Sequence, residues 1–147
     1  MTDPDMSASA SRPGGVTAAV WLLVLGAVLL MAGGLLAANV SLDALRQGAP
    51  ATVSDESIRD YARLYRGAGI IFAVAGVALT AFAVRARDRN PRFRRAAMAL
   101  GLAIVVVVAV AAVFAGTHIL ALLSLLPIIV GTLMLSRPHI VEWYAGG

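Results

Sequence analysis

The residues with the clearest potential to bind a metal or a haem are two histidines, His118 and His139. The chain has no cysteine, so thiolate metal sites, disulfides and cysteine nucleophiles are excluded. In the topology derived below, the two histidines lie at opposite membrane faces, about 30 Å apart. We therefore expect no cofactor and no metal site within one chain, with His118 in an outer turn and His139 at the inner interface. Haem ligation by two histidines would need a histidine from another chain.

A second candidate for chemistry is the carboxylate pair Glu56 and Asp60, which lie one helical turn apart. Such a pair could bind a cation or act in acid–base catalysis, but no histidine or further carboxylate joins it by spacing. Asp55 with Arg59 and Asp60 with Arg63 instead have the spacing of surface ion pairs on a helix. A solvated helix face is the better interpretation.

The densest charged segment is an arginine cluster that contains a single acidic residue, Asp88. Its members are Arg85, Arg87, Arg89, Arg92, Arg94 and Arg95. One interpretation is a clamp for anionic lipids, since each basic residue near a membrane surface contributes about 1 kcal/mol. The favoured interpretation is a determinant of membrane topology. Nucleic acid is not an expected partner, because a short linker fixed at both ends offers no recognition helix or stacking platform.

The composition sets the protein class. The chain has 147 residues, of which 60% are hydrophobic and 14% charged, with a net charge of +4. Soluble domains are roughly half apolar and about a quarter charged. The composition therefore predicts an all-α, polytopic membrane protein.

Four apolar segments are long enough to cross a membrane as helices. They are residues 16–38, 67–84, 96–115 and 119–136. A secretory signal peptide is the alternative for the first, but its apolar stretch exceeds the usual length of about 7–15 residues and follows an acidic start. The apolar run from Ala96 to Leu135 would form a helix about 60 Å long, so the chain must turn back near Gly116-Thr117-His118.

The remaining segments connect or flank these spans. They are a flexible tail (1–15), a polar outer loop (39–66), the basic linker (85–95) and an interfacial tail (137–147). Ser54 is a predicted N-cap, and no helix-breaking residue separates its helix from the second span. Asn90 and Pro91 predict a new helix start after the linker.

The arginine distribution predicts the orientation of the chain. Both tails and the basic linker together hold eight arginines, whereas the outer loop holds four. Because arginine-rich short loops stay in the cytoplasm, we expect two helical hairpins in the plasma membrane, with both termini cytoplasmic.

The four predicted spans contain no Asp, Glu, Lys, Arg or His. Ionisable residues inside a membrane mark proton relays, ion paths and substrate sites. Intramembrane enzymes also need Ser/His, paired Asp or HExxH sets, and none is present. We expect no enzyme activity and no catalytic residue. Small multidrug transporters depend on an acidic residue in the first span, which this chain lacks.

Small residues four positions apart predict close contact between helix backbones. In the first two spans they are Gly33 with Ala37, Gly34 with Ala38, and Gly69 with Ala73. Packing within the bundle is the favoured interpretation, and contact with another membrane protein is the alternative.

Two further features could serve a partner or a movement. Ile58, Tyr61 and Tyr65 form an apolar helix face in the outer loop that would suit a protein partner. Pro127, with Ser124 three residues before it, predicts a kink in the fourth span. A hinge or gate at that position is the less favoured interpretation.

Segment 16–38 and the ending Leu135-Ser136-Arg137-Pro138…Trp143-Tyr144 resemble small, mostly uncharacterised four-span membrane proteins of high-GC Gram-positive (actinobacterial) bacteria. In that group, the last span commonly closes with an Arg-Pro step and an aromatic pair. The resemblance implies a plasma-membrane location and no enzyme activity.

The expected function is that of an accessory or scaffolding subunit, which contacts the lipid bilayer and another membrane protein. The alternative is a self-associating transporter or channel for a hydrophobic or weakly polar substrate. A transporter needs a polar stripe along its spans, for which Thr80, Ser124, Pro127 and Thr132 are the candidates.

Overall fold

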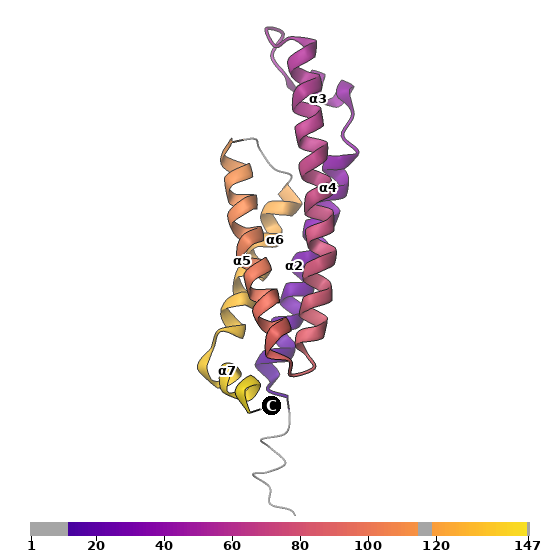
Figure 1. Cartoon of the computed structure of the whole chain (residues 1–147). Coiled ribbons are helices and arrows are strands. Elements are labelled where there is room, and N and C mark those ends of the chain that lie inside the picture. The colour runs from indigo at the N-terminus through magenta and orange to yellow at the C-terminus, as the bar shows by residue number, and fades with distance from the viewer. Residues whose placement is uncertain (1–11, 115–118, 147) are drawn as a thin grey trace, which may run out of the picture.

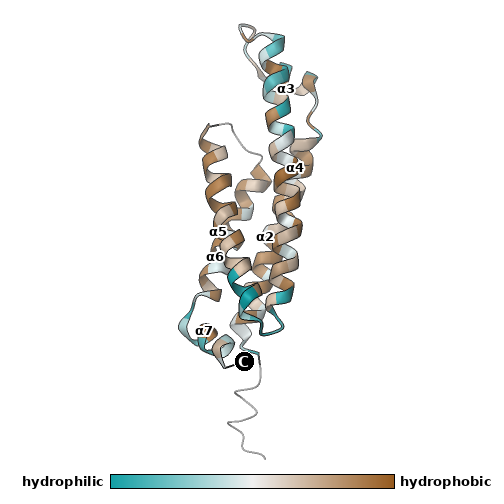
Figure 2. Ribbon diagram, in the orientation of Figure 1, coloured by the Kyte–Doolittle hydropathy of each residue, from teal (hydrophilic) through white to brown (hydrophobic). Residues whose placement is uncertain are grey.

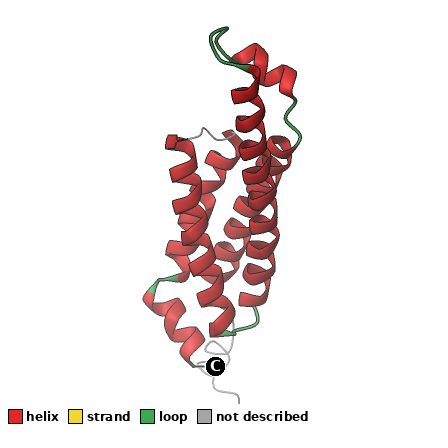
Figure 3. Cartoon of the chain, turned by 45° about the horizontal axis from the view of Figure 1, so that its top comes forward, coloured by secondary structure: helices red, strands yellow, loops and turns green. Residues whose placement is uncertain are grey.

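The computed structural model describes residues 12–114 and 119–146, and these form helices joined by short loops, with no strand in those ranges (Figures 1 and 3). The helices are α2 (Gly14–Ala38), α3 (Leu42–Gly48), α4 (Asp55–Ala86), α5 (Pro91–Phe114), α6 (Ile119–Leu135) and α7 (Pro138–Ala145). The predicted turn at residues 116–118 lies outside the described residues, as do residues 1–11 of the predicted tail.

Two predicted helix starts are confirmed. The Ser54 side chain caps α4 by accepting a 3.2 Å hydrogen bond from the backbone nitrogen of Ser57. From there α4 continues for 32 residues without a break, a length of about 48 Å. Asn90 accepts a 3.0 Å hydrogen bond from the backbone nitrogen of Arg92, and α5 begins at Pro91.

Two short helices were not predicted from the sequence. Helix α3 lies in the segment expected to be an outer loop, and its N-cap Ser41 accepts a 3.1 Å hydrogen bond from the nitrogen of Ala44. Helix α7 lies in the expected interfacial tail and begins at Pro138. In addition, α2 begins at Gly14, inside the segment expected to be a flexible tail.

The helices α2, α4 and α5 are each long and apolar enough to cross a membrane. Helix α6 has 17 residues, a length of about 25 Å. It meets the same criterion together with α7, from which it is bent by 60°. The described chain therefore has three to four candidate spans. Figure 2 shows their apolar residues in a band, with polar residues at both ends of α4.

The four long helices surround one apolar core. Helix α2 packs along α4 and α6, and α5 packs against the same two helices. Large, fully buried side chains from all four helices meet between them, among them Leu23, Leu30, Leu79, Val108 and Ile128.

The crossing of α2 and α4 brings together most of the small residues predicted to pack closely. A Cβ atom on Gly34 would meet the carbonyl oxygen of Gly69, and a Cβ on Gly69 would meet the carbonyl oxygen of Gly34. The nitrogen of Ala38 lies 2.7 Å from the Cβ position of Gly69, and its neighbour Ala37 contacts that position too. The nitrogen of Ala73 lies 2.9 Å from the Cβ position of Gly34. Backbone therefore contacts backbone at this crossing.

The remaining predicted small residue, Gly33, faces α6. Its Cβ position lies 2.9 Å from the nitrogen of Ala121. Seven residues earlier in α2, a Cβ atom on Gly26 would meet the side chain of Ile128 on the same helix α6. Helix α6 continues through Pro127. The predicted kink at this position, and the hinge as its less favoured interpretation, stay predictions.

Candidate functional site

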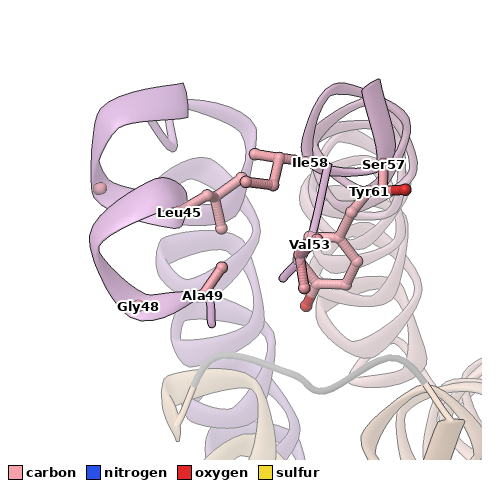
Figure 4. A pocket seen from close by; sticks show the side chains of 8 residues that line it. Leu45, Gly48, Ala49, Val53, Ser57, Ile58 and Tyr61 are labelled. Carbon is pink, nitrogen blue, oxygen red and sulfur yellow. The ribbon is translucent and has the colours of Figure 1, made fainter. Parts of the chain in front are cut away.

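One end of the molecule is a cap formed by α3 and the first turns of α4. Between the two helices is a cleft of about 430 Å³, in which Leu45 and Ile58 point toward one another (Figure 4). The cleft is lined by Ala44, Leu45, Gly48, Ala49, Val53, Ser57, Ile58 and Tyr61. Since these side chains are mostly apolar, the cleft suits an apolar group better than an ion.

Arginine side chains hold this cap in place. Arg46 Nη1 donates a 2.6 Å hydrogen bond to the carbonyl oxygen of Val53 and lies 3.5 Å from Asp55 Oδ1. Arg66 donates from Nε and Nη2 to the carbonyl oxygen of Val40, at 3.0 and 2.7 Å. The end of α2 and the start of α3 are therefore tied to α4.

The predicted ion pairs of the outer helix are found in part. Arg63 lies 3.9 Å from Asp60, as predicted. The predicted pair of Asp55 with Arg59 is wrong, because within the described residues Asp55 pairs with Arg46. Helix α3, absent from the sequence-based prediction, brings Arg46 within reach of this carboxylate. The carboxylates Glu56 and Asp60 lie on an exposed face.

The three residues proposed as an outer partner face have different environments. Ile58 is 6% exposed, because it packs in the cleft wall against α3. Tyr61 is 38% exposed and stacks on the half-buried Tyr65, with ring centroids 5.7 Å apart. Leu64, which is 75% exposed, also belongs to this side of α4, because it lies three residues after Tyr61. The exposed apolar face therefore consists of Tyr61 and Leu64.

At the opposite end of the molecule, α7 lies against the basic linker. Arg89 Nε donates a 2.8 Å hydrogen bond to the carbonyl oxygen of Trp143, and its guanidinium lies 5.3 Å from the centroid of that ring system. Arg89 adopts a left-handed backbone conformation, with φ 60°. The Tyr144 hydroxyl donates a 2.5 Å hydrogen bond to the carbonyl oxygen of Ala86, the last residue of α4.

A second arginine of the cluster also fixes the chain end. Arg94 Nε donates a 3.0 Å hydrogen bond to the carbonyl oxygen of Leu135, the last residue of α6. Its guanidinium lies 5.6 Å from the ring centroid of Tyr144. Arg89 and Arg94 therefore dock the end of the chain onto the linker, a role that the sequence analysis did not predict.

The remaining cluster arginines have no carbonyl or carboxylate partner in the described part of the chain. Arg85 lies over the ring of Phe93 at 5.6 Å. The Nε atom of Arg87 is buried without a hydrogen-bond partner. Arg92 and Arg95 are exposed on the first turns of α5.

Tyr144 has a perturbed acidity that follows from its docked position beyond the end of α6. Burial raises the pKa of its hydroxyl above the usual value, while the positive charges of Arg94 and Arg12 act in the opposite direction. The neutral hydroxyl, which can donate to Ala86, is therefore the favoured form in the folded protein.

The structure describes one of the two histidines. His139 is exposed on α7, and His118 lies outside the described residues. Within residues 12–114 and 119–146, no group of three His, Cys, Asp or Glu residues is arranged to hold a metal ion.

The hydroxyl residues considered for a polar stripe are largely bonded within their own helices. Thr80 donates a 2.9 Å hydrogen bond to the carbonyl oxygen of Gly76, and the buried Ser124 donates a 2.5 Å hydrogen bond to that of Ala121. The buried Thr132 Oγ1 has no hydrogen-bond partner in the described part of the chain.

The ends of the bundle thus carry two distinct surfaces, the apolar cleft of the cap at one end and the arginine cluster combined with α7 at the other. Comparison of the chain with known protein families, curated proteins and solved structures gives no match. The described chain is accordingly characterised by its architecture, an all-helical bundle with three to four helices able to cross a membrane.

Proposed function

We propose that the chain is a non-catalytic accessory or scaffolding subunit of a larger plasma-membrane complex. In this proposal four spans form two hairpins, both termini and the arginine cluster face the cytoplasm, and the cap faces outward. The excess of eight arginines over four supports this orientation. The three to four long apolar helices are compatible with a multi-pass location in that membrane.

The observation that carries the proposal is the projecting cap. Figure 1 shows α3 and the first turns of α4 extending beyond the ends of α5 and α6. This cap exposes Tyr61 and Leu64 beside the apolar cleft. Exposed apolar patches are typical of protein interaction sites.

The chemistry of the cap favours an apolar side chain of a larger membrane protein as the occupant of the cleft. The segment from 39 to 66 has four arginines and four carboxylates, so it has no net charge to attract an ionic ligand. Arg46 ties α3 to Val53 at the edge of the cleft, and Arg66 ties Val40 to α4 below it. A pre-formed cleft reduces the entropy lost when a partner binds.

The long helices leave a second surface for the same partner. Helix α5 buries four of its 24 residues, whereas α2 buries ten of its 25. The exposed side of α5 carries large apolar side chains, including Leu102, Val106 and Val113. This side is available to lipid or to a helix of another protein.

The test is crosslinking in native membranes from a photoreactive amino acid at position 61. The matched control places the same group at position 63, where the side chain of Arg63 is also exposed. We expect position 61 to give one adduct with a larger, different membrane protein, and position 63 to give much less of it. Adducts that contain only this chain, at both positions, would contradict the proposal. They would instead favour the alternative, a self-associating transporter or channel.

A further inference from the structure

The arginine cluster between α4 and α5 has more hydrogen-bond donors than the protein satisfies. Arg89 and Arg94 donate to main-chain carbonyls of the chain end. In the described residues, no ion pair or hydrogen bond to an acceptor involves the side chains of the other four members, Arg85, Arg87, Arg92 and Arg95. Asp88, the acidic residue of the linker, is exposed and has no ion pair within this part of the chain.

The outer arginines form a contrast within the same molecule. Arg46 and Arg63 pair with carboxylates, and Arg66 donates two hydrogen bonds to one carbonyl oxygen. The outer segment is also neutral overall, with four arginines and four carboxylates. The inner cluster therefore differs in having a local positive charge that the protein does not neutralise.

The cluster lies at the border of two apolar helix segments, and this position indicates the source of the negative charge that could balance it. Arg85 directly follows the apolar segment of α4, and Arg95 directly precedes that of α5. Figure 2 shows this polar turn at the end of the apolar band. If these helices cross the membrane, the guanidinium groups lie at the depth of the lipid headgroups. Trp143, whose ring nitrogen is buried without a partner, is an aromatic side chain typical of that depth.

We propose that this cluster binds the phosphodiester group of an anionic phospholipid. Arg92 and Arg95 lie three residues apart on α5, so their side chains are neighbours and both are exposed. Guanidinium groups donate paired, charge-assisted hydrogen bonds to phosphate oxygens. Arg85 and the partly buried Arg87 add positive charge beside them. This binding is independent of the proposed accessory function.

The test is native mass spectrometry of the full chain in detergent, titrated with phosphatidylglycerol and with phosphatidylcholine. The variant R92Q/R95Q removes two charges from the cluster, and the control R59Q/R63Q removes two exposed charges from the outer helix. We expect preferential phosphatidylglycerol binding to fall on the order of ten-fold or more in R92Q/R95Q. The control is expected to bind as the wild type does, and R92K/R95K, which keeps the charge but not the paired donors, is expected to bind between R92Q/R95Q and the wild type.

Three results would overturn this proposal. The first is an unchanged preference for phosphatidylglycerol in R92Q/R95Q, and the second is an equal loss in the outer control. The third concerns the source of the phosphate. We expect that inorganic phosphate, added at the same concentration as the lipid, does not displace phosphatidylglycerol. Displacement at equal concentration would assign the cluster to a soluble phosphate instead of a lipid.

Discussion

Gly34 of α2 and Gly69 of α4 face each other so closely that the carbonyl oxygen of each contacts the place where the other would carry a Cβ atom. Side chains at either position would push the two backbones apart. The contact fixes α4 against α2 just below the point where Arg66 binds the carbonyl oxygen of Val40. The helix that carries the cap is therefore anchored at the base of the cap.

The first prediction concerns this crossing. Gly69→Leu should lower the free energy of unfolding by about 2 kcal/mol or more, because the atoms nearest to the new side chain are backbone atoms that have no rotamer to change. Gly67→Leu is the matched control, since nothing lies within 4 Å of its Cβ position. That control should be neutral or slightly stabilising, because leucine favours a helix more than glycine does. Unfolding in detergent, followed by circular dichroism, measures both variants, and equal destabilisation would contradict the described crossing.

The second prediction concerns the cap formed by α3 and the first turns of α4. Arg46→Ala removes the hydrogen bond to Val53 and the ion pair with Asp55, which together are worth about 1 kcal/mol at this exposed position. Amide hydrogen exchange should accelerate several-fold in α3 and leave the core of α2 unchanged. Arg59→Ala, which removes an exposed arginine without an ion pair in the described structure, should leave exchange in α3 as it is. Equal exchange in the two variants would show that Arg46 does not hold the cap.

The third prediction is a pH dependence at the other end. Burial raises the pKa of Tyr144 in the folded state above that in the unfolded state. The free energy that the buried, neutral Tyr144 hydroxyl contributes to folding is therefore complete below the unfolded pKa of about 10. It is lost as the pH rises through the folded pKa. The melting temperature of the wild type should fall above pH 10. Tyr144→Phe should melt lower at neutral pH and show a smaller fall, whereas parallel curves for the two proteins would refute this role.

The long helices were predictable from the sequence because local signals define them. Ser54 is followed by an acidic first turn, and no helix-breaking residue lies between it and the second apolar run. Asn90-Pro91 combines a capping side chain with the residue best suited to the first helical position. The short helices α3 and α7 have fewer than ten residues each, and helices of that length depend on tertiary contacts.

The spacing of the cluster arginines could not predict which of them donate hydrogen bonds to main-chain carbonyls. Arg89 reaches Trp143 from a left-handed backbone conformation, which a linear pattern of charges does not encode. The position of α7 gives Arg89 a carbonyl acceptor, whereas the four cluster arginines other than Arg89 and Arg94 have none in the described part of the chain. By contrast, small residues four positions apart, Gly34 with Ala38 and Gly69 with Ala73, predicted the close contact of α2 with α4.

The measurement that tests the accessory-subunit proposal most directly is the mass and subunit composition of the complex that contains this chain. The protein would be extracted from its own membranes with a mild detergent and analysed intact. The proposal predicts a stoichiometric complex with a larger, different membrane protein, and loss of that partner when Tyr61 and Leu64 are both replaced by serine. A complex that contains only copies of this chain would contradict it.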